Sequence, residues 1–397
     1  MNLLFIQGGS RLKLSDKGLW YTDPNFTAEI WNRYLDVCDK LTILLRRERK
    51  IYEDSEARSQ FNVIPQDDRI EVIALDDLML PKWNYLNYIL RRRVKKTIFE
   101  AVENCDKAVI RSNTDYTYYA YQACKQYDKA YFHEVTGFAY EGLYYQSFMG
   151  KVLASKMEDR QKLLAREADY ALYVTEHALQ KRYPSNGKML GCSDVNIGCP
   201  DEEVLKHRLD SLMKPKPKIV IGTCGRIADK NKGQHLVIKA LAALRDEGVG
   251  NIEYQLVGFG DPQGLQKLAD EYGVGEKLKF IGGIPYNKMM EWYDNIDIYV
   301  QPSYSEGLSR AIVEAMSRAC PVICSDVGGN SELVDAEFLF PRGNIASLAV
   351  KLHLMMQNDN MGKSARMNFE KSKSFERGLL DTKRHEFFME FISSQDK

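Results

Sequence analysis

Short apolar runs alternate with longer amphipathic stretches along the whole chain. Strands of a parallel sheet are buried on both faces and read as continuous apolar runs, whereas the helices that cover them are apolar on one side. Alternation of the two is typical of parallel sheets covered by helices. The fold class that we predict is therefore α/β.

The apolar runs fall into two series. The first predicts a domain of residues 1–200 with strands near Leu3–Ile6, Leu41–Leu44, Ile70–Ala74, Ala108–Ile110, Ala130–Phe132 and Ala171–Val174. The second predicts a domain of residues 218–375 with strands near Ile219–Ile221, Tyr254–Val257, Lys279–Ile281, Ile296–Val300, Val322–Cys324 and Phe338–Phe340. A chain of 397 residues exceeds the usual limit for one core, so two doubly wound, Rossmann-like domains are expected.

Two further segments organise these domains. Residues 201–217 are charged, and Pro215 and Pro217 favour an extended linker that acts as a hinge. Residues 376–397 predict an amphipathic helix over Glu376–Ile392, which could pack back on the N-terminal domain. Because open parallel sheets bind ligands beyond the carboxyl ends of their strands, two hinged domains predict a cleft between facing strand ends.

Charge and composition exclude several classes of protein. Lys plus Arg and Asp plus Glu number 55 each, so no global field attracts nucleic acid, and no nucleic-acid partner is expected. The start MNLLFIQGG has no basic lead-in, and no apolar run reaches the roughly 18 residues that span a bilayer, so a cytoplasmic protein is expected. The eight cysteines show no C-x-x-C spacing and are interpreted as reduced core residues.

The most informative segment is YVQPSYSEGLSRAIVEAMSRACPVICSDVGGNSELV, from Tyr299 to Val334. A predicted strand ends at its Pro-Ser pair, a turn containing Gly307 follows, and a helix begins near Leu308 and Ser309. The start of a helix leaves unpaired backbone N–H groups and the positive end of the dipole, and both suit a diphosphate.

Two glutamates flank that helix start. Glu306 and Glu314 have seven residues between them, which places them roughly 10 Å apart at about 1.5 Å per helical residue, too far to share one ligand atom. A carboxylate accepts two hydrogen bonds, which matches the vicinal hydroxyls of a sugar ring or a ribose. A single such glutamate is more often a solvated surface residue, and it is the surrounding string that favours a functional interpretation.

This segment resembles the signature of the family 4 retaining glycosyltransferases of GT-B fold, which carry two glutamates at this separation after a Pro-Ser turn. A second block, GTCGRIADKNKGQHLVIKAL from Gly222 to Leu241, is similar to the Gly-Arg loop of that family. The resemblance implies a GT-B fold and retaining transfer of a sugar from a UDP- or GDP-linked donor. The acceptor would be a saccharide or a lipid-linked saccharide, in cell-surface polysaccharide or glycan biosynthesis.

The resemblance also implies roles for individual residues. Glu306 would hold the donor sugar and Glu314 the ribose, while Arg226 and Lys232 would grip the diphosphate, with Lys230 as an alternative. The chain contains no D-x-D pair and no cluster of ligand residues, so neither a metal nor another cofactor is expected, and these cations with the helix start would neutralise the diphosphate.

Glycines contribute further candidate donor contacts. Gly258, in LVGFGDPQG, would line the donor pocket, and Gly283 and Ile284, in FIGGIP, would pass along the nucleobase through their backbone. Gly8 and Gly9 follow the first predicted strand, where the missing Cβ would let the backbone approach the donor phosphates, although an ordinary turn explains them as well.

His133, in YFHEVTGF, fits the position of a family histidine that contacts the donor sugar, and a hydrogen-bonded core histidine is an equal alternative. The chain departs from the family pattern at Leu190–Gly198, to which we assign no role. Two alternatives to a glycosyltransferase stay open. One is another enzyme of this fold, a nucleotide-sugar epimerase or a glycoside phosphorylase, and the other is an inactive sugar-nucleotide-binding subunit.

Residues 81–102, PKWNYLNYILRRRVKKTIFEAV, combine a basic cluster with aromatic and apolar side chains on a predicted helix. This make-up is typical of a helix that lies in a bilayer interface, although a helix that packs on a core is an equal alternative. We therefore expect an anionic membrane surface as a partner, which would make the protein peripheral at the inner face of the cell membrane. The residues concerned are Trp83, Arg91, Arg92, Arg93, Lys95 and Lys96.

Overall fold

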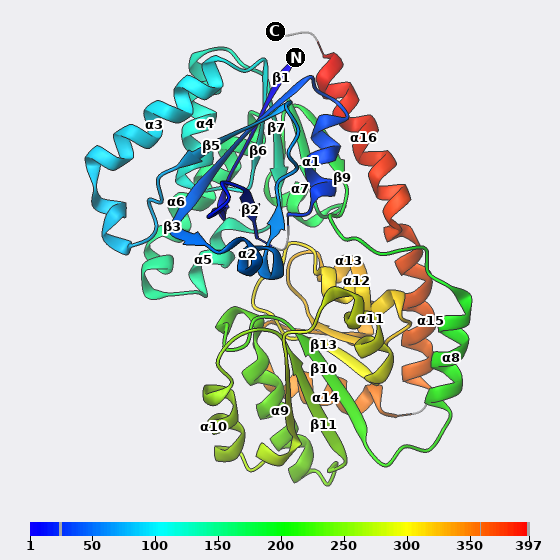
Figure 1. Ribbon diagram of the computed structural model, residues 1–397. Helices are drawn as coiled ribbons and strands as arrows, with labels where there is room; N and C mark the ends of the chain where they lie inside the picture. The colour runs from blue at the N-terminus through cyan, green and yellow to red at the C-terminus, as the bar shows by residue number, and fades with distance from the viewer. Residues whose placement is uncertain (24–25, 358, 395–397) are drawn as a thin grey trace.

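The computed structural model describes residues 1–23, 26–357 and 359–394 as two α/β domains joined at a hinge (Figure 1). Parallel strands form the core of each domain and helices cover them, so the predicted fold class is confirmed. The long parallel strands are buried on both faces, as their continuous apolar sequences require.

The N-terminal domain orders its parallel strands β5-β3-β1-β6-β7-β8-β9. The bounds of its strands are β1 Asn2–Ser15, β2 Trp20–Thr22, β3 Lys40–Tyr52, β4 Asn62–Val63, β5 Ile70–Leu75, β6 Lys107–Arg111, β7 Tyr131–Val135, β8 Tyr170–Tyr173 and β9 Lys188–Gly191. Its helices are α1 Ala28–Leu35, α2 Asp54–Gln60, α3 Tyr88–Glu103, α4 Asp115–Gln126, α5 Ala139–Tyr144, α6 Phe148–Arg166 and α7 Ala178–Arg182, with a 3-10 turn at Lys82–Leu86.

The C-terminal domain orders its strands β12-β11-β10-β13-β14-β15. Its strands are β10 Ile219–Cys224, β11 Ile252–Val257, β12 Leu278–Gly282, β13 Ile298–Gln301, β14 Val322–Ser325 and β15 Leu339–Phe340. Its helices are α8 Glu202–Leu212, α9 Gln234–Asp246, α10 Gln263–Glu271, α11 Tyr286–Asn295, α12 Arg310–Ser317, α13 Asn330–Leu333, α14 Ile345–Met355 and α15 Asn360–Ser372. In both sheets the strand order reverses at the first strand of the domain, which is where open α/β sheets bind ligands.

The first strand does not end near Ile6 as predicted, because β1 continues to Ser15 and there pairs with the short antiparallel strand β2. Its pairing with β3 jumps from Gln7 to Arg11, so Gly8 and Gly9 lie in an irregularity within the strand. A Cβ on Gly8 would lie 2.1 Å from the Thr114 hydroxyl that caps α4, so close packing explains this glycine.

The predicted extended linker is wrong over most of its length, because residues 202–212 form α8. Asp201 caps this helix by accepting the Glu203 N–H, and acidic residues fill its first turn. Arg208 is buried and donates to the backbone carbonyls of Tyr293 and Ile296. Because these two carbonyls belong to the C-terminal domain, α8 belongs to that domain as well. Pro215 and Pro217 follow the helix.

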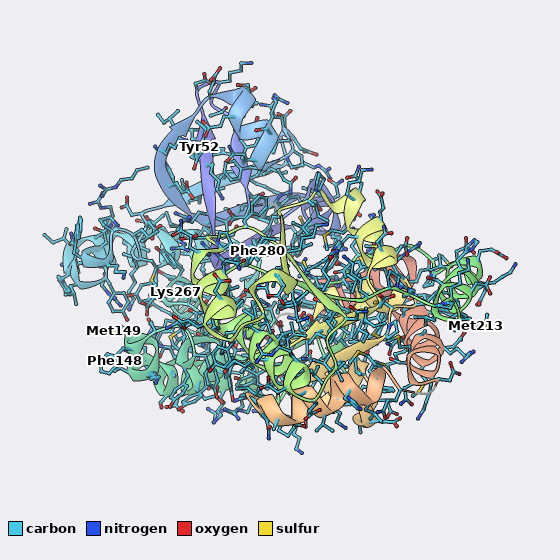
Figure 2. All side chains as sticks on the ribbon, turned by 90° about the horizontal axis from the view of Figure 1, so that it is seen from below. Tyr52, Phe148, Met149, Met213, Lys267 and Phe280 are labelled. Carbon is cyan, nitrogen blue, oxygen red and sulfur yellow. The ribbon has the colours of Figure 1, made fainter. Side chains whose placement is uncertain are left out.

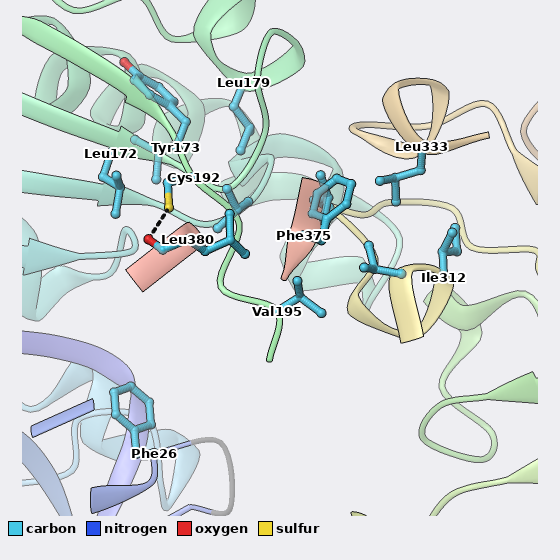
Figure 3. Packing of buried hydrophobic residues seen from close by; sticks show 14 of the residues in the cluster. Phe26, Leu172, Tyr173, Leu179, Cys192, Val195, Ile312, Leu333, Phe375 and Leu380 are labelled. Atoms are coloured by element: carbon cyan, nitrogen blue, oxygen red, sulfur yellow. Dashed lines mark hydrogen bonds between the residues drawn. The ribbon is translucent and has the colours of Figure 1, made fainter. Parts of the chain in front are cut away.

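The chain passes between the domains twice, and the two crossings lie side by side. Ile197 bridges Glu376, and the Ile197 carbonyl accepts the Arg377 N–H at 3.0 Å. At this hinge, Phe375 lies between Leu380 and Leu333 of the C-terminal domain in the view of Figure 3, and Cys192 donates to the Leu380 carbonyl.

After the second crossing, α16 (Arg377–Ser393) packs on the N-terminal domain along one side of the molecule (Figure 1). Phe388 stacks on Phe132 with ring centroids 4.2 Å apart, and the buried Lys107 ammonium donates to the Phe391 carbonyl. None of the helices in the described ranges combines the length and the apolar run that crossing a bilayer requires.

Candidate active site in the cleft between the domains

A cavity of about 930 Å³ lies between the carboxyl ends of the two sheets. Arg111 and Glu134, at the ends of β6 and β7, line it from one side, and Cys224 and Gln301, at the ends of β10 and β13, from the other. Of the predicted site residues, the cavity wall includes Lys232, Ile284, Glu306, Gly307, Leu308, Ser309 and Glu314.

Glu306 is held by three donors that converge on one of its carboxylate oxygens. Oε1 accepts from Lys232 Nζ at 2.8 Å, from Ser303 Oγ at 2.7 Å and from Gln301 Nε2 at 3.0 Å. The Glu306 side chain is only 12% exposed, and Oε2 takes part in none of these three contacts. This fixed orientation leaves one oxygen for a ligand hydroxyl.

Lys232 is the last residue of a 3-10 turn, Lys230–Lys232, on the loop after β10. Its stem passes Gly225, where an added Cβ would lie 3.3 Å from Lys232 Cγ. Burial lowers the pKa of Lys232, but the Glu306 carboxylate outweighs this effect, and the net pKa is raised. The cavity therefore contains the charged Lys232 ammonium beside the Glu306 carboxylate.

The helix α12 begins at Arg310, two residues after the predicted start, with Ser309 as its N-cap residue. Residues 307–311 line the cavity, so the start of α12, where backbone N–H groups lack intrahelical acceptors, borders this cavity. The side chain of the N-cap residue Ser309 makes no capping hydrogen bond.

Glu314 lies on the second turn of α12 and accepts a hydrogen bond from the Tyr293 hydroxyl at 3.0 Å. Burial raises the pKa of Glu314, against the opposing effects of Tyr293 and Arg310. Glu306, on the loop before α12, and Glu314, on the helix itself, thus line one cavity.

If Glu314 binds the ribose of a nucleotide donor, as the sequence predicts, Glu314→Gln should raise the KM for that donor more than it lowers kcat, because such a contact is made equally in the ground and transition states. Since its pKa is raised, Glu314 takes up a proton at a higher pH than an exposed glutamate. The KM of the wild type should therefore rise as the pH falls, and that of Glu314→Gln should not.

Steady-state kinetics between about pH 5 and 8 test this expectation. Tyr293→Phe removes a donor that favours the carboxylate, so it should move the rise in KM to higher pH. A defect in kcat alone for Glu314→Gln would contradict the ribose assignment.

The N-terminal wall carries a charged network that the sequence did not reveal. Arg111 forms ion pairs with Glu134 and Asp194, and the Tyr34 hydroxyl donates to Glu134 at 2.9 Å. Burial raises the pKa of Asp194, but Arg310 and Arg111 outweigh it, so the net pKa is lowered. Arg111 and Glu134 could have been found from the sequence, because each is a charged residue near the end of a buried strand, β6 or β7. Asp194 lies in the segment to which we assigned no role.

His133 does not reach the cavity, so its predicted contact with the donor is wrong in this structure. Its ring is fully buried, with Nδ1 donating to the Ile110 carbonyl at 2.8 Å and Nε2 accepting from Gln161 of α6 at 3.0 Å. Burial lowers the pKa of His133 to about 4. His133 lies two residues before the carboxyl end of β7, whereas Glu134 and Val135, nearer that end, line the cavity.

The other predicted donor residues lie outside the cavity wall. Arg226 is exposed on the same loop as Lys232, and Gly8 and Gly9 lie beyond Gln7, which does line the cavity. Gly258 allows a close approach between loops, since a Cβ would lie 2.0 Å from the Gly225 carbonyl oxygen, and Gly283 lies against the ring of Phe259. These glycines shape the loops around Lys232 and Ile284 without facing the cavity.

Two doubly wound domains with a cavity between the carboxyl ends of their sheets define the GT-B class of glycosyltransferase folds. The sequence profile described as glycosyl transferases group 1 matches residues 208–373. Protein CapJ from Staphylococcus aureus is 33% identical over 356 residues, which cover 88% of this chain and 84% of CapJ. The chain therefore belongs to the glycosyl transferases group 1 family.

Other similarities are more distant. The amylovoran biosynthesis glycosyltransferase AmsK from Erwinia amylovora is 28% identical over 187 residues, which cover 42% of this chain and 45% of AmsK. The crystal structure of HepE from Anabaena in complex with UDP-glucose superimposes with a TM-score of 0.61 at 18% identity, and the match covers 98% of this chain and 100% of HepE. At that identity the likeness concerns the fold.

Proposed function

We propose that this protein transfers a sugar, with retention of anomeric configuration, from a nucleotide diphosphate donor to a saccharide or lipid-linked saccharide. The observation that carries the proposal is the Lys232–Glu306 pair in the cavity, with the open start of α12 beside it and Glu314 further along the helix. A cation, the start of a helix and two separated carboxylates match a diphosphate flanked by a sugar and a ribose.

In this proposal the C-terminal wall binds the donor. Glu306 accepts hydrogen bonds from hydroxyls of the donor sugar, and Lys232 and the N–H groups of residues 307–311 bind the diphosphate. Arg226 would join them only after its exposed side chain reorients. The nucleobase would lie along Ile284, where backbone contacts do not choose between uracil and guanine.

The reaction breaks the bond between the anomeric carbon and the phosphate oxygen, and it forms a bond from that carbon to an acceptor oxygen. The acceptor proton passes to the departing phosphate, and the nucleoside diphosphate leaves. Lys232 and the helix start stabilise the charge that develops on the leaving group. They do so without a metal ion, since an ammonium and backbone dipoles take over that neutralisation.

The relatives support the class of donor and the biological setting. UDP-glucose occupies the HepE structure, and the name of AmsK assigns it to biosynthesis of amylovoran. We therefore propose a UDP- or GDP-sugar as donor and cell-surface polysaccharide or glycan as product, made at the cytoplasmic side of the membrane.

The test is to incubate the purified protein with a panel of UDP-, GDP- and ADP-sugars, and to measure thermal protection and release of free nucleotide. We expect one base to protect, with slow release that persists in excess EDTA. Protection without release from any donor would favour an inactive binding subunit. Loss of release in EDTA that magnesium or manganese restores would contradict metal independence.

We also propose that α3 holds the protein at an anionic membrane. Around its start, Trp83, Leu86, Tyr88 and Ile89 are each between 73% and 84% exposed. Arg92, Arg93 and Lys96 are exposed beside them, and basic residues near an anionic surface gain about 1 kcal/mol each. Arg91 has a structural role instead, since it binds the Tyr85 carbonyl and the Tyr119 hydroxyl.

A second exposed apolar group lies on α6, which starts with Phe148, Met149 and Val152, each between 63% and 82% exposed (Figure 2). Asp115 at the start of α4 pairs with Arg91 of α3 and with Arg160 of α6, so both helices flank α4. Two apolar helix starts on one domain would anchor it more firmly than one.

Co-sedimentation with vesicles tests this membrane proposal. We expect binding to anionic vesicles at low salt, weaker binding at high salt and little binding to neutral vesicles. Two variants should each bind anionic vesicles less than the wild type does. One combines Leu86→Ser with Ile89→Ser, and the other changes Arg92, Arg93 and Lys96 to Gln. Met213→Ser is the control, because Met213 is 76% exposed at the opposite edge in Figure 2. Binding that neither variant reduces would remove α3 as an anchor.

A further inference from the structure

Glu332 of the C-terminal domain makes a three-point contact with the backbone of the N-terminal domain. Its carboxylate accepts the N–H groups of Glu176 at 2.7 Å, of His177 at 3.0 Å and of Ala178 at 2.6 Å. Hydrogen bonds to a carboxylate are among the stronger polar contacts in proteins. The contact is therefore a specific attachment between domains that the chain joins only at the hinge.

The segment that carries Glu332 also supports the loop that carries Glu306 and Gly307, which we call the donor loop. The Gly329 N–H donates to the Gly307 carbonyl at 2.7 Å. Gly328 has a positive φ of 56° and leaves no room for a side chain, since a Cβ would lie 1.8 Å from the Glu306 carbonyl oxygen. Residues 328–332 are thus packed beneath the donor loop at one end and bonded to the N-terminal domain at the other.

The donor loop itself contacts the N-terminal domain at Gly307. A Cβ there would lie 2.3 Å from the Thr136 carbonyl oxygen and 3.2 Å from a methyl group of Val174. Thr136 and Val174 both line the cavity. The distance between Glu306 and the N-terminal wall therefore depends on how closely the domains approach at this point.

We propose that Glu332 is a positioning residue, which holds the domains closed and so sets the N-terminal wall against the donor loop. It touches no substrate. The inference rests on the proposed transfer reaction for its effect on catalysis, whereas its effect on domain closure is independent of that reaction.

The position of Glu332 predicts which kinetic constant changes. Nucleotide bound to the C-terminal domain would keep its contacts when the domains separate, but an acceptor on the opposite wall would lose its alignment with the donor. We expect Glu332→Ala to lower kcat by about tenfold or more, since one hydrogen bond to a charged group is worth roughly tenfold and three are removed. The dissociation constant of the nucleoside diphosphate should change by less than about threefold.

Small-angle X-ray scattering with the bound nucleoside diphosphate tests closure directly, and we expect a larger radius of gyration for Glu332→Ala than for the wild type. Glu332→Gln keeps one acceptor oxygen and the volume of the side chain, so it should fold even if the alanine variant does not, and it should give an intermediate result. The matched control is Glu337→Ala, because Glu337 pairs with Lys363 within its own domain.

Wild-type scattering and wild-type kcat for both Glu332 variants would overturn the proposal. So would an equal loss of kcat and of nucleotide affinity, which would assign Glu332 to the shape of the donor site alone. If the wild type transfers no sugar from any donor, the proposed function fails, and the scattering result still decides whether Glu332 holds the domains closed.

Discussion

Lys232→Ala is expected to lower turnover by roughly two to three orders of magnitude, the effect of losing one charge-stabilising group at a transition state. Lys232 is 28% exposed, lines the cavity and keeps a raised pKa through Glu306. In the proposed reaction, negative charge grows on the leaving diphosphate as the sugar bond breaks, and the loss should therefore be greater in kcat than in donor affinity.

Initial-rate kinetics with the donor that the nucleotide panel identifies provide the measurement. Lys230→Ala is the matched control, since Lys230 belongs to the same 3-10 turn but is exposed and does not line the cavity. Near-normal turnover of a folded Lys232→Ala variant would remove Lys232 from the reaction. A large loss for Lys230→Ala alone would transfer the role to that residue.

The secondary structure of the two sheets was predictable because buried parallel strands carry an unmistakable apolar pattern. Each predicted strand overlaps an observed one, whereas β2, β4 and β9 were missed. Lys188 and Met189 of β9 are exposed at the edge of the sheet, so this strand lacks the continuous apolar run of its neighbours. The helix α8 was missed for another reason, since Pro215 and Pro217 indicate where it cannot continue but not where it begins.

Much of the C-terminal wall of the cavity was predictable from one local string, because residues 306–314 lie within a single strand-turn-helix unit. Glu306, Ser309 and Glu314 are close in sequence, so a local pattern was enough to indicate that they lie near one another. The opposite wall is assembled from strand ends far apart in sequence, and the sequence does not say which residues near each strand end reach the cavity. The predicted donor contact of His133 was wrong for this reason, and the alternative of a hydrogen-bonded core histidine describes its place in the structure.

The pairing of Lys232 with Glu306 has a consequence for how their substitutions combine. Each side chain contributes to holding the other, at 2.8 Å, so the two substitutions are not independent. Residues in direct contact commonly show coupling of about 0.5 to 3 kcal/mol. The double alanine variant should therefore lose less activity than the product of the two single losses.

Glu306→Ala is expected to lower turnover by roughly two to three orders of magnitude, with a smaller effect on binding of the free nucleoside diphosphate. The substitution removes the acceptor that Lys232, Gln301 and Ser303 share, and it also removes the oxygen that the donor sugar would bind. Because the nucleoside diphosphate lacks the sugar, its affinity reports the diphosphate and ribose contacts alone.

Glu306→Gln separates the loss of the negative charge from the loss of the hydrogen-bond acceptor. It keeps the shape of the side chain and one acceptor oxygen but removes the charge. If the carboxylate charge is what aligns Lys232 and supports the developing positive charge on the sugar, Glu306→Gln should be nearly as slow as Glu306→Ala. Thermal unfolding and binding of the nucleoside diphosphate show whether each variant is folded. Near-normal turnover of both folded variants would place the donor sugar elsewhere in the cleft, and equal losses of turnover and nucleotide affinity would assign Glu306 to binding of the diphosphate.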